Sequence, residues 1–143
     1  TAVTEARIAN IAHDRLRALT RTHPRVAEAL WRDTLIEAST YREWLLSLGR
    51  RPAPVRMAHL ICELHARLRA LGLADDNAYA LPITQLVMAD ALGLSPVHVN
   101  RSLQDLRAAG LISWAHGSLV IHDMQALAQL GEFAPGYLHQ LAA

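Results

Sequence analysis

The residues best suited to recognition chemistry are Asn100, Arg101 and Gln104, which lie within an expected helix over residues 96–109. An Arg side chain can donate two hydrogen bonds to O6 and N7 of guanine, and Asn or Gln can bond N6 and N7 of adenine. At helical spacing these three side chains share one face, opposite the apolar Val99, Leu103 and Leu106. A solvated helix would also carry polar residues there, so the neighbouring elements decide whether this face reads DNA.

Two short helices joined by a glycine are expected to position that face. Thr84 is suited to cap a helix over residues 85–92, because its hydroxyl can accept a backbone N–H. Gly93 can turn the chain sharply, and Ser95 can cap the second helix with Pro96 at its first position. The spacing predicts a helix-turn-helix. Its buried side is expected to be Met88, Leu92, Leu94, Val99, Leu103 and Leu106.

A hairpin is expected directly after the second helix. Residues 111–114 and 119–121 have strand-like apolar patterns, and the turn between them contains Gly117, where a positive φ is allowed. Such a hairpin is a wing. The backbone N–H groups at its tip, together with His116, can contact a phosphate.

A long helix is expected upstream of these elements. No Pro or Gly interrupts the chain between Pro24 and Leu48, and Gly49 offers a stop. A wide apolar arc and an imperfect heptad favour pairing with a second copy over an ordinary core helix. The expected dimer interface is Leu30, Thr34, Glu37, Tyr41, Trp44 and Leu48.

The remaining segments have weaker patterns. Residues 3–8 are interpreted as a strand, residues 13–22 as a short helix, residues 55–71 as a helix, residues 73–80 as a polar loop and residues 124–130 as a helix capped by Asp123. The apolar row of the helix over residues 55–71 is Met57, Leu60, Ile61, Leu64 and Leu68. Cys62 lies beside that row and is expected to be a small buried apolar residue.

Composition excludes several classes of protein. With 143 residues, of which 52% are hydrophobic and 19% charged, the chain can bury a core and is not of the disordered type. It lacks an apolar run long enough for a membrane span, so no membrane partner and a cytoplasmic location are expected. One cysteine supports neither a disulfide framework nor a cysteine-ligated cluster.

An enzyme is not expected, because none of the familiar catalytic or phosphate-binding motifs occurs. His59 and Glu63 are four residues apart, but two ligands do not make a metal site. We interpret them as surface or half-buried positions, and we expect neither a metal nor a cofactor.

Several segments resemble the C-terminal part of Crp/Fnr family bacterial transcription regulators. The most specific are residues 47–64, 81–84, 92–103 and 110–112. The resemblance implies a mainly α fold: residues 1–23 would end a cyclic-nucleotide-binding-like β-roll sensor, residues 24–49 would be the dimerisation helix, and residues 50–143 would form a winged helix-turn-helix domain. It further implies a homodimer on an inverted repeat of double-stranded DNA, with RNA polymerase as a candidate partner.

Individual positions refine what the resemblance implies. Arg101 matches the base-reading Arg of the family, whereas members that read TGTGA or TTGAT half-sites have Glu at the position of Val97. The pair Tyr41-Arg42 replaces the Thr-Ser of cyclic-AMP-sensing members, which argues against that effector and leaves the effector unknown. The expected DNA-binding set is Thr84, Gln85, Ser95, Pro96, Val97, His98, Asn100, Arg101, Gln104, His116 and Gly117.

Two alternatives to this function stay open. One is a winged-helix module that binds proteins rather than DNA. The other is a winged-helix regulator of a different family, in which the long helix packs within a monomer. Salt-dependent binding to duplex DNA tests the first alternative, and the mass of the native particle tests the second.

Overall fold

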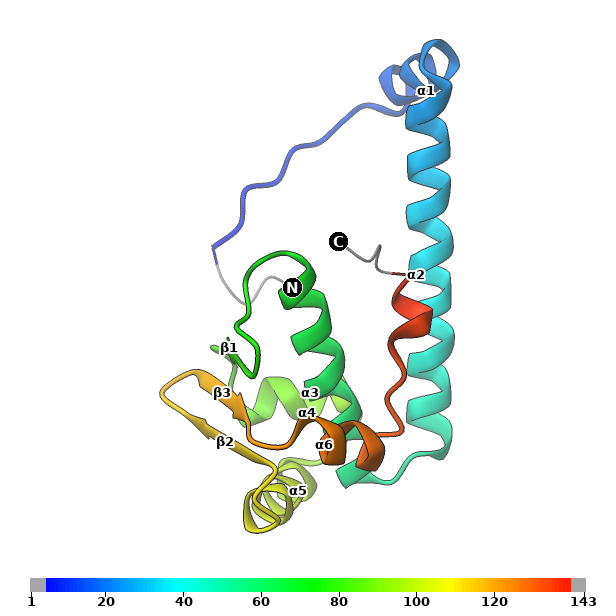
Figure 1. The fold of residues 1–143 in the computed structure, drawn as a ribbon. Helices are drawn as coiled ribbons and strands as arrows, with labels where there is room; N and C mark the ends of the chain where they lie inside the picture. The colour runs from blue at the N-terminus through cyan, green and yellow to red at the C-terminus, as the bar shows by residue number, and fades with distance from the viewer. Residues whose placement is uncertain (1–4, 140–143) are drawn as a thin grey trace.

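The computed structural model describes residues 5–139, and these form a mainly helical fold with one small antiparallel sheet. Figure 1 shows the second helix as a long rod beside a packed unit formed by the later elements. In chain order the elements are α1 (His13–Thr22), α2 (Pro24–Arg50), α3 (Ala53–Ala70), β1 (Ala78–Ala80), α4 (Gln85–Leu92), α5 (Pro96–Ala108), β2 (Ile112–Ala115), β3 (Ser118–Ile121), α6 (Met124–Leu130) and the 3₁₀ turn η1 (Pro135–Leu138).

The segment before α2 differs in part from expectation. The short helix α1 is where the sequence predicts it, but residues 5–12 have no regular secondary structure. The expected strand over residues 3–8 is therefore wrong for residues 5–8, while Val3 and Thr4 lie outside the described residues. An extended segment becomes a strand only when another strand pairs with it, and none is paired with residues 5–8 in the described part of the chain.

Gly49 is expected to end the long helix α2. The helix instead continues to Arg50. Gly49 keeps a helical conformation and is not among the glycines with positive φ. The helix ends because Pro52 disfavours a helical residue before it, and Arg51 is extended with φ −80° and ψ 134°. The result is an uninterrupted helix of 27 residues.

The core of the packed unit is centred on α3, which lies against α5 and α6. The helix-turn-helix contributes the expected buried side chains, with Leu94 only partly buried. Cys62 is 1% exposed, and burial raises the pKa of its thiol to about 12, as suits a small apolar residue. The largest fully buried side chains are Met57, Ile61, Met88, Leu103, Leu106, Leu119, Ile121 and Leu127.

The sheet has three strands in the order β1-β3-β2, one more than the hairpin expected from the sequence. The extra strand, β1, lies in the segment interpreted as a loop, and it pairs with β3 in the register Tyr79↔Leu119. Tyr79 secures β1 because its side chain is buried and its hydroxyl donates a hydrogen bond of 3.1 Å to the carbonyl oxygen of Ile61. Three residues are too few to show an alternating pattern, so no periodic signal marks this strand.

Two glycines predict opposite effects of a Gly→Ala substitution on stability. At Gly131, φ is −76° but an added Cβ would lie 2.6 Å from the backbone nitrogen of His59. Gly131→Ala should therefore lower the free energy of unfolding by about 1–3 kcal/mol.

At Gly49 nothing lies within 4 Å, so Gly49→Ala in α2 should raise the free energy of unfolding by about 0.5–1 kcal/mol. Urea unfolding measures the free energy of unfolding of both variants. If both variants were less stable than the natural chain, the close approach at Gly131 would not be the cause of its loss of stability.

Candidate nucleic-acid interface

Side-chain caps fix the start of both helices of the helix-turn-helix. The hydroxyl of Thr84 accepts a hydrogen bond from the N–H of Val87 at 3.2 Å, which begins α4. The hydroxyl oxygen of Ser95 accepts one from the N–H of His98 at 3.3 Å, which begins α5. Between them Gly93 takes the left-handed conformation, with φ 60° and ψ 40°. The local signals in the sequence thus predict this turn correctly.

One face of α5 is buried and the opposite face is free of the core. Val99, Ser102, Leu103 and Leu106 are buried against the rest of the unit. The expected reading side chains, Pro96, Val97, His98, Asn100, Arg101 and Gln104, are all exposed. Val97 is 76% exposed, so an apolar side chain stands near the N-terminal end of this face.

Two of the expected DNA contacts touch each other. The side-chain amide of Asn100 on α5 donates a hydrogen bond of 3.3 Å to the side-chain oxygen of Gln85 on α4. Gln85 occupies the first turn of α4, directly after the Thr84 cap. A second internal contact joins Ser95 Oγ and His98 Nδ1 at 2.9 Å, which holds the imidazole beside the start of α5. These contacts limit the orientations open to Asn100 and His98.

The hairpin is fixed to α5 and to the segment before α4. Arg107 at the end of α5 donates to the carbonyl oxygen of Trp114 on β2 at 2.9 Å. At the tip, both His116 and Gly117 have positive φ, as the favoured two-residue hairpin turn requires. His116 is exposed, but it lines a hollow with Leu73 and Ala80 rather than packing beside α5. Figure 1 shows the turn between β2 and β3 at the end of the hairpin that points away from α5, so the wing tip and the reading face do not form one cluster.

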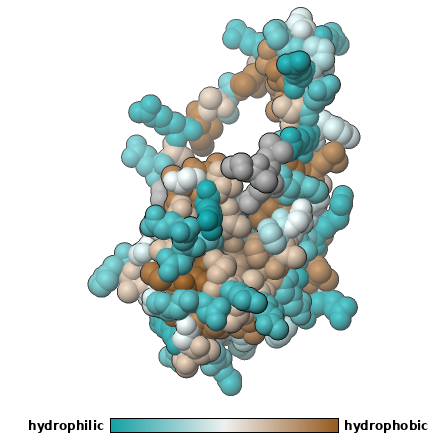
Figure 2. Space-filling model, in the orientation of Figure 1, coloured by the Kyte–Doolittle hydropathy of each residue, from teal (hydrophilic) through white to brown (hydrophobic). Residues whose placement is uncertain are grey.

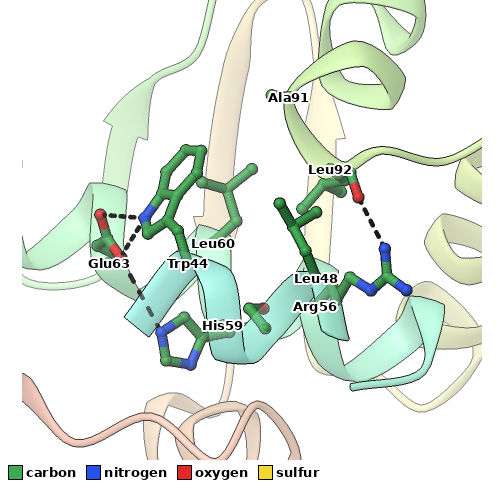
Figure 3. Close-up of a pocket in the computed structure, with 9 residues that line it drawn as sticks. Trp44, Leu48, Arg56, His59, Leu60, Glu63, Ala91 and Leu92 are labelled. Atoms are coloured by element: carbon green, nitrogen blue, oxygen red, sulfur yellow. Dashed lines mark hydrogen bonds and ion pairs between the residues drawn. The ribbon is translucent and has the colours of Figure 1, made fainter. Parts of the chain in front are cut away.

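Two of the expected dimer residues on α2, Trp44 and Leu48, also contact other helices of the same chain. The indole N–H of Trp44 donates hydrogen bonds of 3.0 and 3.1 Å to the carboxylate of Glu63 in the same chain, so its polar edge is paired within the chain. Figure 3 shows Trp44 and Leu48 directed towards Leu60 of α3 and Leu92 of α4. Leu48 is nonetheless 43% exposed and lies five helical turns after Leu30, on the same side of α2.

A second face of α2 is apolar and uncovered. Figure 2 shows brown apolar side chains at several points along this helix, among teal hydrophilic ones. Large apolar side chains of α2 that are at least 42% exposed include Leu30, Trp31, Leu35, Tyr41, Leu45 and Leu48. Among the expected interface residues, Leu30 and Tyr41 belong to this face, and Thr34 and Glu37 are exposed as well.

The interpretation of His59 and Glu63 as surface or half-buried positions is wrong, because they are 3% and 1% exposed. Burial lowers the pKa of His59, whose Nδ1 donates to the carbonyl oxygen of Gly131 at 2.9 Å. Apart from Arg67, one helical turn after Glu63, the polar partners that bury these two residues lie far away in the sequence, so helical spacing alone could not reveal the burial. Between residues 5 and 139, no group of three or more His, Cys, Asp or Glu side chains is arranged to hold a metal ion. In the same range, no helix combines the length and apolar character needed to cross a bilayer.

The capped helix pair, its buried row and the hairpin together define a winged helix-turn-helix unit attached to a long helix. A family model described as the Crp-like helix-turn-helix domain matches residues 55–130. The chain belongs to this family, which confirms the resemblance to Crp/Fnr regulators.

Relatives and solved structures agree with this assignment. Transcriptional activator protein FnrL of Cereibacter sphaeroides is 38% identical over 93 residues, which are 63% of this chain and 38% of the relative. Nitrogen fixation regulation protein FixK of Azorhizobium caulinodans is 31% identical over 130 residues, or 90% of this chain and 52% of the relative. The structure of FixK2 from Bradyrhizobium japonicum matches with a TM-score of 0.76 at 28% identity, over 87% of this chain and 61% of that chain. The chain thus spans less than two thirds of the length of each.

Proposed function

We propose that this chain is the dimerising and DNA-reading part of a Crp/Fnr-type transcription regulator. The observation that carries the proposal is the exposed face of α5, where Asn100, Arg101 and Gln104 project from a helix whose opposite side is buried. Arg101 is assigned to guanine, and Asn100 and Gln104 to further base edges. The N-termini of α4 and α5, with Thr84, Gln85, Ser95 and His98, and the wing tip at His116 and Gly117 are assigned to phosphates.

The second part of the proposal is the geometry of the target. Pairing of two chains along the apolar face of α2 relates their recognition helices by a two-fold axis. Those helices then enter successive major grooves on one face of the duplex. The target is an inverted repeat whose half-site centres are about 34 Å, or about 10–10.5 base pairs, apart.

The cellular role follows from the same proposal. A regulator of this kind acts on double-stranded DNA in the cytoplasm, with RNA polymerase as its candidate partner, and performs no catalysis itself. The Tyr41-Arg42 pair is exposed on α2, and we assign no cyclic-AMP site to it.

Binding to duplex DNA at several salt concentrations tests the proposal. The logarithm of the association constant should fall linearly with the logarithm of salt concentration, with a slope of about −0.9 for each phosphate contacted. A selected duplex should bind at least about 10³-fold more tightly than random DNA. Binding that shows neither the slope nor the preference would favour a protein-interaction module. A monomer that prefers single half-sites would favour a winged-helix regulator of another type.

Val97 predicts which half-sites are selected. It offers no hydrogen bond, so it can contribute only apolar contact, for instance to a thymine methyl group. Selection from a random oligonucleotide pool should recover half-sites that contain a guanine but differ from TGTGA and TTGAT. Val97→Glu should shift the selection towards those two sequences, because a carboxylate can accept from the cytosine amino group.

Val97→Leu, which keeps an apolar side chain, is the control and should leave the selected sequence unchanged. Recovery of an unaltered TGTGA repeat by the natural chain would contradict the role given to Val97.

A further inference from the structure

The most deeply buried carboxylate of the winged unit, Glu63, lies where three segments of the chain meet. Its carboxylate accepts hydrogen bonds from the indole N–H of Trp44 on α2 and, at 2.6 Å, from the hydroxyl of Tyr137. It also forms an ion pair of 3.1 Å with Arg67. Burial and this carboxylate raise the pKa of Tyr137, so its hydroxyl stays protonated and donates. None of these residues belongs to the reading face of α5, so DNA contact does not explain them.

The third segment is a C-terminal strap, which we define as residues 131–138. It runs from the end of α6 along α2, and η1 lies against both α2 and α3. The ring of His59 stacks on Tyr137 with centroids 5.9 Å apart and meets Phe133 edge-on at 5.4 Å. Leu138 at the end of η1 is buried. The strap therefore contacts both the winged unit and the long helix.

A second ion pair joins the same parts of the molecule. Arg51, between α2 and α3, is 7% exposed and contacts Glu43 of α2 at 2.6 Å and Glu132 of the strap at 3.1 Å. Burial alone would lower the pKa of Arg51, but the hydrogen bonds and charges of the two carboxylates outweigh it, and the pKa is raised. The guanidinium therefore stays charged and links the end of α2 to the strap.

These contacts favour one arrangement of the winged unit on α2. A buried carboxylate is tolerated only while its donors stay in place, because an unpaired buried charge is strongly destabilising. The donors to Glu63 come from α2, α3 and the strap. A rotation of the winged unit about its junction with α2 would withdraw at least one of them.

We propose that Glu63 and Tyr137 are positioning residues that set which spacing between half-sites the dimer accepts. The inference rests on the proposed function, in which α2 forms the dimer and α5 reads each half-site. Because the two α5 helices are held apart by α2 and its junction, the angle at that junction sets their separation. A junction held at one angle accepts one spacing, and a loosened junction accepts several.

Inverted repeats with different spacers test this inference. The half-site selected by the natural chain is placed in duplexes whose spacer changes by one base pair at a time, with a single half-site as the reference. The variants are Tyr137→Phe and Glu63→Gln. The matched control is Tyr79→Phe, which also removes a buried tyrosine hydrogen bond but leaves the junction intact.

The natural chain and Tyr79→Phe should bind one spacing best. In Tyr137→Phe and Glu63→Gln the ratio of affinities between the best spacing and its neighbours should fall about tenfold, the scale of one charge-assisted hydrogen bond. Their affinity for the single half-site should stay within about twofold of the natural chain, because α5 is unchanged.

If the ratio of affinities between the best spacing and its neighbours is unchanged in both variants, the inference is overturned. A uniform loss of affinity on every duplex, including the single half-site, also overturns it, since that outcome marks a role in stability alone. If the natural chain prefers no inverted repeat over the single half-site, the proposed dimeric function fails first, and the inference falls with it.

Discussion

Arg101→Ala should abolish most of the sequence preference of this chain. A bidentate Arg–guanine contact is worth about 1–3 kcal/mol of discrimination, and a dimer makes it twice. The loss on a selected inverted repeat is therefore expected to be about 2–6 kcal/mol, or roughly 30-fold to 10⁴-fold in affinity. Binding to random DNA should change little. Titration of both duplexes at one salt concentration measures the difference.

Arg69→Ala is the matched control for this experiment. Arg69 is also an exposed arginine, but it lies near the end of α3 and pairs with Asp76 at 2.9 Å. Its replacement should leave the preference intact. Equal losses on selected and random DNA in Arg101→Ala would show that Arg101 contacts only phosphate, which would lower the salt slope by about one.

The second large effect is expected from Leu45→Glu in α2. Leu45 is 69% exposed and lies one turn after Tyr41 on the uncovered apolar face. Burying a carboxylate there should cost about 2 kcal/mol or more on each side of a two-fold interface. The dissociation constant of the dimer should rise about 10³-fold, and binding to the inverted repeat should weaken with it.

Leu71→Glu is the control because Leu71 is 71% exposed and follows α3, away from the uncovered face of α2. It should leave the mass distribution unchanged. Sedimentation equilibrium of the natural chain and the two variants measures the association. A natural chain that stays monomeric at high micromolar concentration would contradict a dimer built on α2 alone.

The helix-turn-helix could be predicted from the sequence because its signals are local. Thr84, Gly93 and Ser95 act on their immediate neighbours, and the buried row of α5 repeats within one helix. Two local signals compete at the end of α2. Gly49 predicts the end of α2, but the helix continues to Arg50 and ends before Pro52, because a glycine permits a turn without requiring one.

The junction could not be predicted because its partners are distant in the sequence. Trp44 meets Glu63 on another helix, and Tyr137 meets it from the other end of the unit. A periodic pattern shows that Trp44 lies on an apolar side of α2 but not which neighbour covers it. The same limit made His59 and Glu63 look like surface residues.

The burial of Cys62 gives the chain a built-in reporter. Alkylating reagents attack an accessible thiolate, and a pKa of about 12 at a site 1% exposed leaves almost none in the closed state. The rate of labelling therefore measures how often the packed unit around α3 unfolds locally and exposes the Cys62 thiol. Because Cys62 is the sole cysteine, no engineered label is needed. Duplex DNA that binds only the folded unit would slow the labelling, so its binding can be followed by mass spectrometry.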